Sequence, residues 1–119
     1  MQDLIKVMKA LSDETRLRIL NLLLERECCV CEVMQALDIS QTRASRNLVI
    51  LRDAGFLKAR REGLWIVYSV DWQTTNRFTT YLAKLLRDSP ISNEILEKDK
   101  ERLKHTKRAG PGCRQKTRK

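Results

Sequence analysis

Three of the four cysteines lie together in the segment Cys28-Cys29-Val30-Cys31, and the fourth is Cys113. Thiolates bind soft and borderline metal ions, so such a cluster can capture a thiophilic metal or metalloid. Cysteines near the N-terminus of a helix tend to have a lowered pKa and to react as thiolates, and we expect this of Cys29 and Cys31. Cys28 and Cys31 also have the Cys-x-x-Cys spacing of a redox pair. The segment therefore predicts a metal site or a thiol-based sensor.

The spacing of these cysteines limits which of them can share one ion. In a regular helix Cys29 and Cys31 are separated by about 200° and point to nearly opposite sides. Their sulfurs could converge only if that turn deformed, whereas Cys28 and Cys31, three residues apart, can share a face. Helix geometry alone therefore does not decide which of these thiols bind one ion.

The elements that must position the cysteines are mostly helical. Apolar residues recur at helical spacing, and capping residues or glycine and proline stops bound the runs. The expected helices cover residues 3–11, 13–26, 30–37, 40–54, 74–88 and 92–103, and the expected strands cover 56–61 and 64–70 around a Glu62-Gly63 turn. Two helices joined by a three-residue turn and followed by a hairpin predict a mainly α fold with a small β-hairpin, a winged helix-turn-helix.

The helix expected over residues 40–54 has polar and basic side chains opposite its apolar stripe. The first turns of such a helix can enter the major groove of DNA, where these side chains reach base edges or phosphates. The candidate DNA contacts are Ser40, Gln41, Thr42, Arg43, Ser45, Arg46 and Asn47 on this helix, with Arg60 and Arg61 in the wing. A solvated helix face beside an ordinary charged hairpin is the alternative, but the order of turn, basic helix and basic hairpin favours binding to double-stranded DNA.

Basic charge is concentrated in two parts of the chain, whose net charge is +9. Residues 98–119 contain ten Lys and Arg side chains and two acids, and residues 40–61 contain six basic side chains and one acid. We expect a DNA-binding and dimerisation domain over 1–90, a weak C-terminal helix over 91–104, and a basic, disordered tail over 105–119. The tail is either a solvated extension or a nonspecific arm for phosphates.

Three stretches of the chain resemble the ArsR/SmtB family of metal-responsive repressors. The family's opening helix is similar to residues 11–20 (LSDETRLRIL), its recognition helix to residues 40–48 (SQTRASRNL), and the exit from that helix to residues 51–57 (LRDAGFL). Two positions depart from the pattern: Thr42, where members often have proline, and Asn47, where they often have histidine. The resemblance implies a homodimer, with the first and fifth helices at the interface, and negative regulation at an operator.

Within that family, the sequence Cys29-Val30-Cys31 is similar to the Cys-Val-Cys core of the branch that responds to arsenite and antimonite. The similarity implies that As(III) or Sb(III) is the inducer, bound pyramidally by thiolates, with no organic cofactor. The resemblance implies Cys29 and Cys31 as ligands, but Met34 stands where members of that branch often have a third cysteine. Cys28 is then the expected third ligand and Cys113 the other candidate, and a two-thiolate site completed by water or an exogenous thiol remains open. We therefore predict a repressor that leaves its operator when As(III) or Sb(III) binds, because deformation of the helix over 30–37 would shift the recognition helix packed on it.

Two alternative functions are a redox-sensing repressor and a sensor of another thiophilic metal such as Cd(II). Zinc, cobalt and nickel sensors of this family use histidines and carboxylates on the fifth helix, and residues 74–88 contain no histidine and only Asp88. Cadmium and lead sensors usually have an additional N-terminal cysteine, and none precedes Cys28. A closed four-ligand zinc site would need Cys113 or His105 from the tail.

Enzymatic and membrane functions have no support in the sequence. The single histidine, His105, lies in the basic tail, and there is no phosphate-binding loop or paired-carboxylate motif. No run of about 18 apolar residues occurs. The N-terminal Met1-Gln2-Asp3-Leu4 lacks the basic-then-apolar pattern of a secretory signal. We expect a non-enzymatic, cytoplasmic protein whose thiols are kept reduced.

Overall fold

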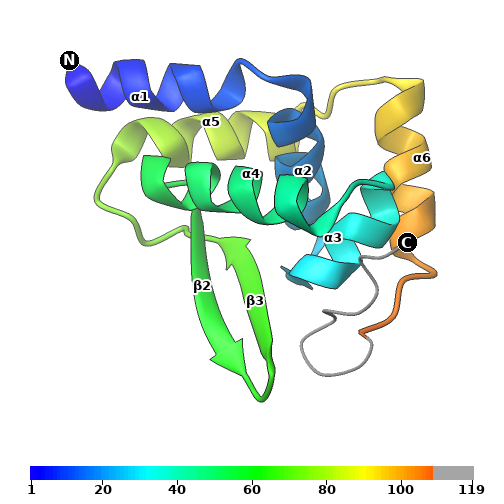
Figure 1. The fold of residues 1–119 in the computed structure, drawn as a ribbon. Helices are drawn as coiled ribbons and strands as arrows, with labels where there is room; N and C mark the ends of the chain where they lie inside the picture. Colours follow the sequence, from blue (N-terminus) through cyan, green and yellow to red (C-terminus); the bar gives the residue numbers. More distant parts are fainter. Residues whose placement is uncertain (109–119) are drawn as a thin grey trace.

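The computed structural model describes residues 1–108, which form helices around a small sheet. The elements in chain order are α1 (Gln2–Leu11), α2 (Glu14–Glu25), β1 (Cys28–Cys29), α3 (Val30–Leu37), α4 (Gln41–Ala54), β2 (Leu57–Glu62), β3 (Trp65–Val70), α5 (Arg77–Asp88) and α6 (Glu94–Leu103). Figure 1 shows α1 and α5 side by side, with α4 beneath them and the β2–β3 hairpin extending away from the helices. The predicted winged helix-turn-helix is confirmed, since α3 and α4 form the helix pair and β2 and β3 form the wing.

Capping residues set the ends of α2 and α4. Asp13 precedes α2 in an extended conformation, and its carboxylate accepts a hydrogen bond from the Arg16 N–H at 3.0 Å. Ser40 begins α4 in the same way, because its Oγ accepts from the Arg43 N–H at 3.2 Å. Gly55 ends α4 with a φ of 104°, a conformation that side chains with a Cβ rarely adopt. α4 therefore begins and ends where its sequence predicts.

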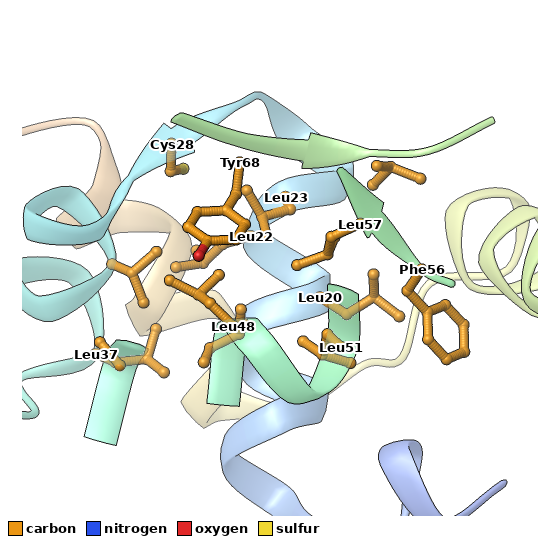
Figure 2. Close-up of a cluster of buried hydrophobic side chains, with 14 of the residues drawn as sticks. Leu20, Leu22, Leu23, Cys28, Leu37, Leu48, Leu51, Phe56, Leu57 and Tyr68 are labelled. Carbon is orange, nitrogen blue, oxygen red and sulfur yellow. The ribbon is translucent and has the colours of Figure 1, made fainter. Parts of the chain in front are cut away.

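The core lies between α2, α4 and the sheet, and Figure 2 shows part of it. The side chains of Ala44, Leu48 and Leu51, predicted as the inward stripe of α4, are fully buried. They pack with side chains that are no more than 1 % exposed, including Ile19, Leu20, Leu22, Phe56 and Val67. Burial of each large apolar side chain contributes about 1.5–3 kcal/mol, so this cluster fixes α4 relative to α2.

The sheet has a strand that the sequence analysis missed. β1 pairs antiparallel with β3, opposite Tyr68 and Val67, which gives the strand order β1-β3-β2. A two-residue strand is too short to have a detectable alternation of apolar and polar residues. The wing also turns one position later than predicted, at Gly63 and Leu64, because Glu62 pairs with Trp65. The cysteine segment is therefore part of the same sheet as the wing.

The C-terminal helix α6 packs against α2 and α3 as part of the fold. Asp99 of α6 is fully buried and accepts hydrogen bonds from Arg18 Nε and Nη2, both at 2.9 Å, and from Arg102 Nη2 at 3.2 Å. In the segment expected to form the tail, residues 106–108 make hydrogen bonds to α3 and its surroundings. Leu103, at the end of α6, is 4 % exposed and joins the core cluster.

One face of the molecule exposes apolar side chains from two helices. Leu4 and Met8 of α1 and Tyr81 and Leu85 of α5 are all more than a third exposed, up to 66 % for Tyr81. α1 and α5 are neighbours, so these exposed apolar side chains come from adjacent helices. No helix within residues 1–108 combines the length and the apolar character needed to cross a membrane.

Candidate functional site

The sulfurs of Cys29 and Cys31 lie 3.2 Å apart at the start of α3. Cys29 precedes the helix as its N-cap, with an extended backbone (φ −85°, ψ 170°), while Cys31 lies within the first helical turn. The two residues are therefore not at helical spacing, and their sulfurs meet although α3 is a regular helix. Our expectation that convergence requires a deformed turn is wrong, because it assumed that Cys29 lies inside the helix.

Glu32 fixes the position of Cys29. The Cys29 N–H donates to Glu32 Oε1 at 2.8 Å, and the Glu32 backbone N–H is directed at the Cys29 side chain, which completes a capping box. The Glu32 side chain is only 8 % exposed, and its charge is balanced by Arg26 Nη1 at 3.3 Å and Arg108 Nε at 3.4 Å. We call Cys29, Cys31 and Glu32 the cysteine site.

Burial changes the acidity expected for these thiols. The pKa of Cys29 is raised because burial disfavours the thiolate, and hydrogen bonds from the backbone N–H groups of Glu32 and Cys31 offset this only in part. Burial also raises the pKa of Cys28 to about 12. The lowered pKa that we expected from the helix N-terminus is therefore not found for Cys29. Burial favours the protonated thiol of Cys29, so a thiophilic atom that binds its sulfur must displace the thiol proton.

Cys28 lies on the other side of β1 from Cys29. Consecutive residues of a strand point to opposite faces, and Cys28 points into the core beside Tyr68 and Leu22 (Figure 2). Its thiol donates to the Arg26 carbonyl at 3.5 Å and is fully buried. The structure therefore brings Cys29 and Cys31 together and places Cys28 elsewhere.

The third ligand is absent from the part of the chain that the structure describes. Among residues 1–108, no group of three or more His, Cys, Asp and Glu side chains is arranged to hold a metal ion. Cys113, the other candidate from the sequence, lies outside the described residues. His105 is exposed and lies within 3.4 Å of Glu101 rather than near the sulfurs. The described residues thus offer a two-sulfur site.

The outer face of α4 is open to solvent where the sequence predicts DNA contacts. Thr42, Arg43 and Arg46 are exposed, while Gln41 and Ser45 are half-buried. Ser40 is exposed but its side chain caps the helix. Together with Arg61 of the wing, which is also exposed, we call Thr42, Arg43 and Arg46 the DNA face.

Asn47 differs from its predicted neighbours because it is only 8 % exposed. Its Oδ1 accepts from Arg16 Nη1 at 2.9 Å, and its Nδ2 donates to the Arg43 carbonyl at 2.9 Å. Arg43 in turn donates from Nη2 to Thr15 Oγ1 at 2.7 Å. Thr15 and Arg16 thus join α2 to the recognition helix, a role that the sequence analysis did not identify. Both residues lie in the first turn of α2, after its cap at Asp13.

Of the two wing arginines, Arg60 is held by other residues of the protein, as Asn47 is, whereas Arg61 is not on the same face of the strand. Arg60 donates from Nη1 and Nη2 to the two carboxylate oxygens of Glu27, both at 2.8 Å, and from Nη2 to Glu62 at 3.1 Å. The hydrogen bonds to Glu27 raise the pKa of Arg60. Arg61 points to the other face of β2 because strand side chains alternate. The residue just before Cys28 is therefore tied to the wing by a bidentate ion pair.

The segment from the cap of α2 to the start of the wing is similar in sequence to known regulators. Residues 13–59 match the model of the family described as bacterial regulatory protein, arsR family. The chain is 49 % identical over 63 residues to the arsenic resistance transcriptional regulator ArsR1 of Pseudomonas putida. This match covers 52 % of this chain and 49 % of that protein. It is 46 % identical over 70 residues to the cadmium resistance transcriptional regulatory protein CadC homolog of Staphylococcus aureus, and this match covers 58 % of each chain. The chain thus spans about half the length of these curated relatives.

The fold is similar to that of a solved regulator. The homodimeric winged helix-turn-helix DNA-binding domain from Mycobacterium bovis, described as a possible ArsR-family transcriptional regulator, superposes with a TM-score of 0.62. The two chains are 32 % identical, and the match covers 73 % of this chain and 77 % of that domain. Sequence and fold therefore agree on the same class of protein.

Proposed function

Since the chain belongs to the ArsR family of bacterial regulatory proteins, we propose that it is a homodimeric transcriptional repressor that leaves its operator DNA when As(III) binds Cys29 and Cys31. The observation that carries the proposal is the 3.2 Å separation of these two sulfurs at the start of α3. α3 is the first helix of the helix-turn-helix, so the inducer would bind next to the element that reads DNA.

The DNA face supports the first half of the proposal. A helix fits the major groove, where Arg and Thr can contact base edges, and Arg46 and Thr42 are exposed for this purpose. The helix N-terminus at Ser40, with Gln41 and Ser45, favours a phosphate through its free N–H groups. Arg61 would contact the backbone beside the groove. Asn47 would act indirectly, by holding the turn that carries Arg43.

The geometry of the sulfur pair supports As(III) or Sb(III) as inducer. An atom bonded to both sulfurs at about 2.3 Å, the length of a typical zinc–thiolate bond, would subtend an angle of about 90° across the 3.2 Å separation. Tetrahedral coordination would place the sulfurs about 3.8 Å apart at the same bond length. An angle near 90° is typical of a three-coordinate, pyramidal atom with a lone pair. Cys29 and Cys31 are therefore spaced for a pyramidal metalloid.

Cd(II) is the second candidate inducer, because the relative from Staphylococcus aureus is named for cadmium resistance. Cd(II) is soft and prefers thiolates, but as a larger ion it would need a wider sulfur separation and more ligands than residues 1–108 supply. The sulfur spacing therefore favours the metalloid, and direct competition between the two inducers decides between them.

The apolar face of α1 and α5 supports a homodimer. Leu4, Met8, Tyr81 and Leu85 expose apolar surface on adjacent helices, and continuous apolar patches of this kind commonly mark interfaces between proteins. The solved relative from Mycobacterium bovis is described as homodimeric. A two-fold dimer would place two recognition helices on one side of the assembly, for two half-sites of the operator.

Two connections could carry the effect of the inducer to the DNA face. α3 packs directly on α4, and the cysteine segment is a strand of the wing's sheet through the pairing of β1 with β3. The ion pair between Glu27 and Arg60 adds a contact between the cysteine segment and the wing. Movement of Cys29 toward a bound metalloid would therefore shift β1, and with it the wing and α4.

The test is a titration of labelled operator DNA, selected from a random duplex library, measured by fluorescence anisotropy. Sodium arsenite should weaken operator binding about 10- to 100-fold, as is typical of allosteric coupling, and Cd(II) and Zn(II) should have smaller effects. Cys29→Ser and Cys31→Ser should bind DNA with the affinity of the native protein and lose the response to arsenite. Equal operator affinity with and without arsenite in the native protein would refute the proposal.

A further inference from the structure

The residues after α6 fold back onto α3. Gln35 of α3 and the backbone of Lys107 form two hydrogen bonds: Gln35 Nε2 donates to the Lys107 carbonyl at 2.7 Å, and the Lys107 N–H donates to Gln35 Oε1 at 3.1 Å. Thr106 is also held, because Arg26 Nη2 donates to its Oγ1 at 3.3 Å. We call residues 104–108 the α6 extension. These bonds fix the path of its backbone along α3 and bring its last residue to the wing.

Arg108, the last residue of the α6 extension, joins α3 to the wing. Its Nε lies 3.4 Å from Glu32 Oε1, in the first turn of α3, and its Nη1 lies 3.2 Å from Glu62 Oε1. Its guanidinium also lies 5.9 Å from the centre of the Trp65 ring, within the range of a cation–π contact. Glu62 and Trp65 are the paired residues on either side of the wing's turn. One guanidinium, whose donors have a fixed fork geometry, therefore connects the tip of the wing to α3.

Arg108 also extends a row of alternating charges along one face of the wing. Side chains two residues apart on a strand share a face, so Arg60 and Glu62 lie together on β2, and Arg60 Nη2 donates to Glu62 Oε1 at 3.1 Å. Arg60 in turn binds Glu27 through two hydrogen bonds of 2.8 Å. Arg61 lies on the opposite face of β2, where it is exposed. Contact with Arg108 therefore leaves the Arg61 face of the wing open to DNA.

The contacts of Arg108 act on the wing more than on the stability of the whole fold. The side chains of Arg108 and Glu62 are 26 % and 51 % exposed, and ion pairs near the surface contribute little to the free energy of unfolding. β1 pairs with β3 at Tyr68 and Val67, so residues 61–66 of the wing extend beyond the end of β1. Arg108 anchors this outer part of the wing to α3.

We propose that Arg108 is a positioning residue for DNA binding, which fixes the outer part of the wing so that Arg61 meets the DNA backbone while α4 occupies the groove. A wing that is fixed in advance loses less conformational freedom when DNA binds, so preorganisation raises the affinity. The inference rests on the proposed function, in which Arg61 contacts DNA beside the recognition helix. Arg108 acts through the wing rather than by contact with DNA.

A double-mutant cycle between Arg108 and Arg61 tests the proposal. Operator affinity of the full chain is measured by fluorescence anisotropy without inducer. Arg108→Ala should weaken binding about threefold and Arg61→Ala about fivefold, and the double variant should lose no more than about sixfold, because Arg108 acts through Arg61. Independent contributions would instead multiply, to a loss of about 15-fold. When Arg61 is already alanine, removal of Arg108 should leave the slope of log affinity against log salt unchanged.

Two further variants separate position from charge. Lys107→Ala removes an exposed cation from the same segment but keeps both hydrogen bonds to Gln35, which involve the Lys107 backbone. Its operator affinity should stay within about 1.5-fold of the native value. Gln35→Ala keeps every charge but releases the α6 extension from α3. It should weaken operator binding about twofold in the native chain, and less when Arg61 is already alanine.

Trp65 reports the motion of the wing directly. With Trp72→Phe, Trp65 is the single tryptophan of the chain, and time-resolved fluorescence anisotropy measures how freely its ring moves. Arg108→Ala should increase the amplitude of the fast motion of Trp65, and Lys107→Ala should not. Circular dichroism and thermal unfolding of Arg108→Ala should match those of the native protein, because its ion pair with the wing is partly exposed.

The outcomes are distinguishable. Multiplicative losses from Arg108→Ala and Arg61→Ala, or native operator affinity in Arg108→Ala, would overturn the inference and leave the proposed function intact. An equal loss of affinity in Lys107→Ala would show that Arg108 contributes only its positive charge, and would overturn the inference as well. Failure of the native protein to bind any DNA duplex would overturn the proposed function and, with it, this inference.

Discussion

The DNA face and the cysteine site lie on consecutive helices of one helix-turn-helix, yet they are built in opposite ways. The DNA face consists of exposed side chains on α4 and β2, among them Arg46 and Arg61. The cysteine site is buried, and part of its surroundings comes from far along the chain, such as the Lys107 carbonyl, 76 residues after Cys31. One is a surface defined by local helix periodicity, and the other is an interior defined by tertiary contacts.

This difference matters for function. A DNA face must be accessible before its partner arrives, so its side chains can change without loss of the fold. Lys107 and Arg108 contact the cysteine site, so a metalloid bound there, as we propose, would disturb residues that hold α3, α6 and the wing together. The coupling that we propose between the two regions rests on this placement of the thiols inside the structure.

The largest expected effect is on the interior side of the comparison. Asp99→Ala should lower the free energy of unfolding by about 3 kcal/mol, because it leaves Arg18 without the buried carboxylate that binds it at 2.9 Å. Thermal and urea unfolding measure this loss. Asp53→Ala, on the exposed side of α4, should change the stability by less than about 0.5 kcal/mol. Similar losses for the two variants would show that α6 does not hold the cysteine site in place.

The next effect falls on the DNA face. Arg46→Ala should weaken operator binding by about 1–3 kcal/mol, the usual cost of losing an arginine contact to a base edge. Its unfolding free energy should stay native, since Arg46 is exposed. Anisotropy titration measures the affinity, and Lys98→Ala, an exposed cation on α6, is the matched control. A stability loss in Arg46→Ala, with unchanged DNA binding, would reverse the assignment of this face.

The same contrast explains what the sequence could and could not predict. The start of α4 at Ser40, its end at Gly55 and its buried stripe at Leu48 and Leu51 depend on nearest neighbours along the chain, and all were predicted. The convergence of Cys29 and Cys31 was not, because it depends on β1, a two-residue strand that exists only through its pairing with β3, nearly forty residues later.

Two DNA candidates show the limit of reasoning from helix faces. Asn47 has the right residue type and lies on the predicted recognition helix, but Arg16 of α2 binds its side chain. Arg60 has the right charge, but Glu27 binds its guanidinium through two hydrogen bonds. In both cases a partner from a distant segment decides what the side chain contacts, and no local pattern reveals that partner. The long-range ion pairs of Arg108 with Glu32 and Glu62 belong to the same class.

The two arginines of the wing give a sharper test of the comparison. Arg61→Ala should weaken operator binding about fivefold and reduce the slope of log affinity against log salt by about 1, as expected for the loss of one phosphate contact. Arg60→Ala should weaken it less than threefold, because Glu27 and Glu62 already occupy its guanidinium. Titrations at several salt concentrations measure both values. Equal slopes for the two variants would mean that Arg60 exchanges its carboxylate partners for DNA.

The smallest effect lies where the two regions meet. Glu27→Gln removes the carboxylate that holds Arg60 and leaves the fold intact, since both side chains are more than 40 % exposed. The freed guanidinium should then reach phosphate, so operator affinity without inducer should rise about two- to threefold. That gain should vanish when Arg60→Ala is added, and a double-mutant cycle measured by anisotropy gives the coupling directly. A gain that persists in the double variant would come from the lost negative charge alone. The ion pair next to Cys28 would then not connect the cysteine site to the wing.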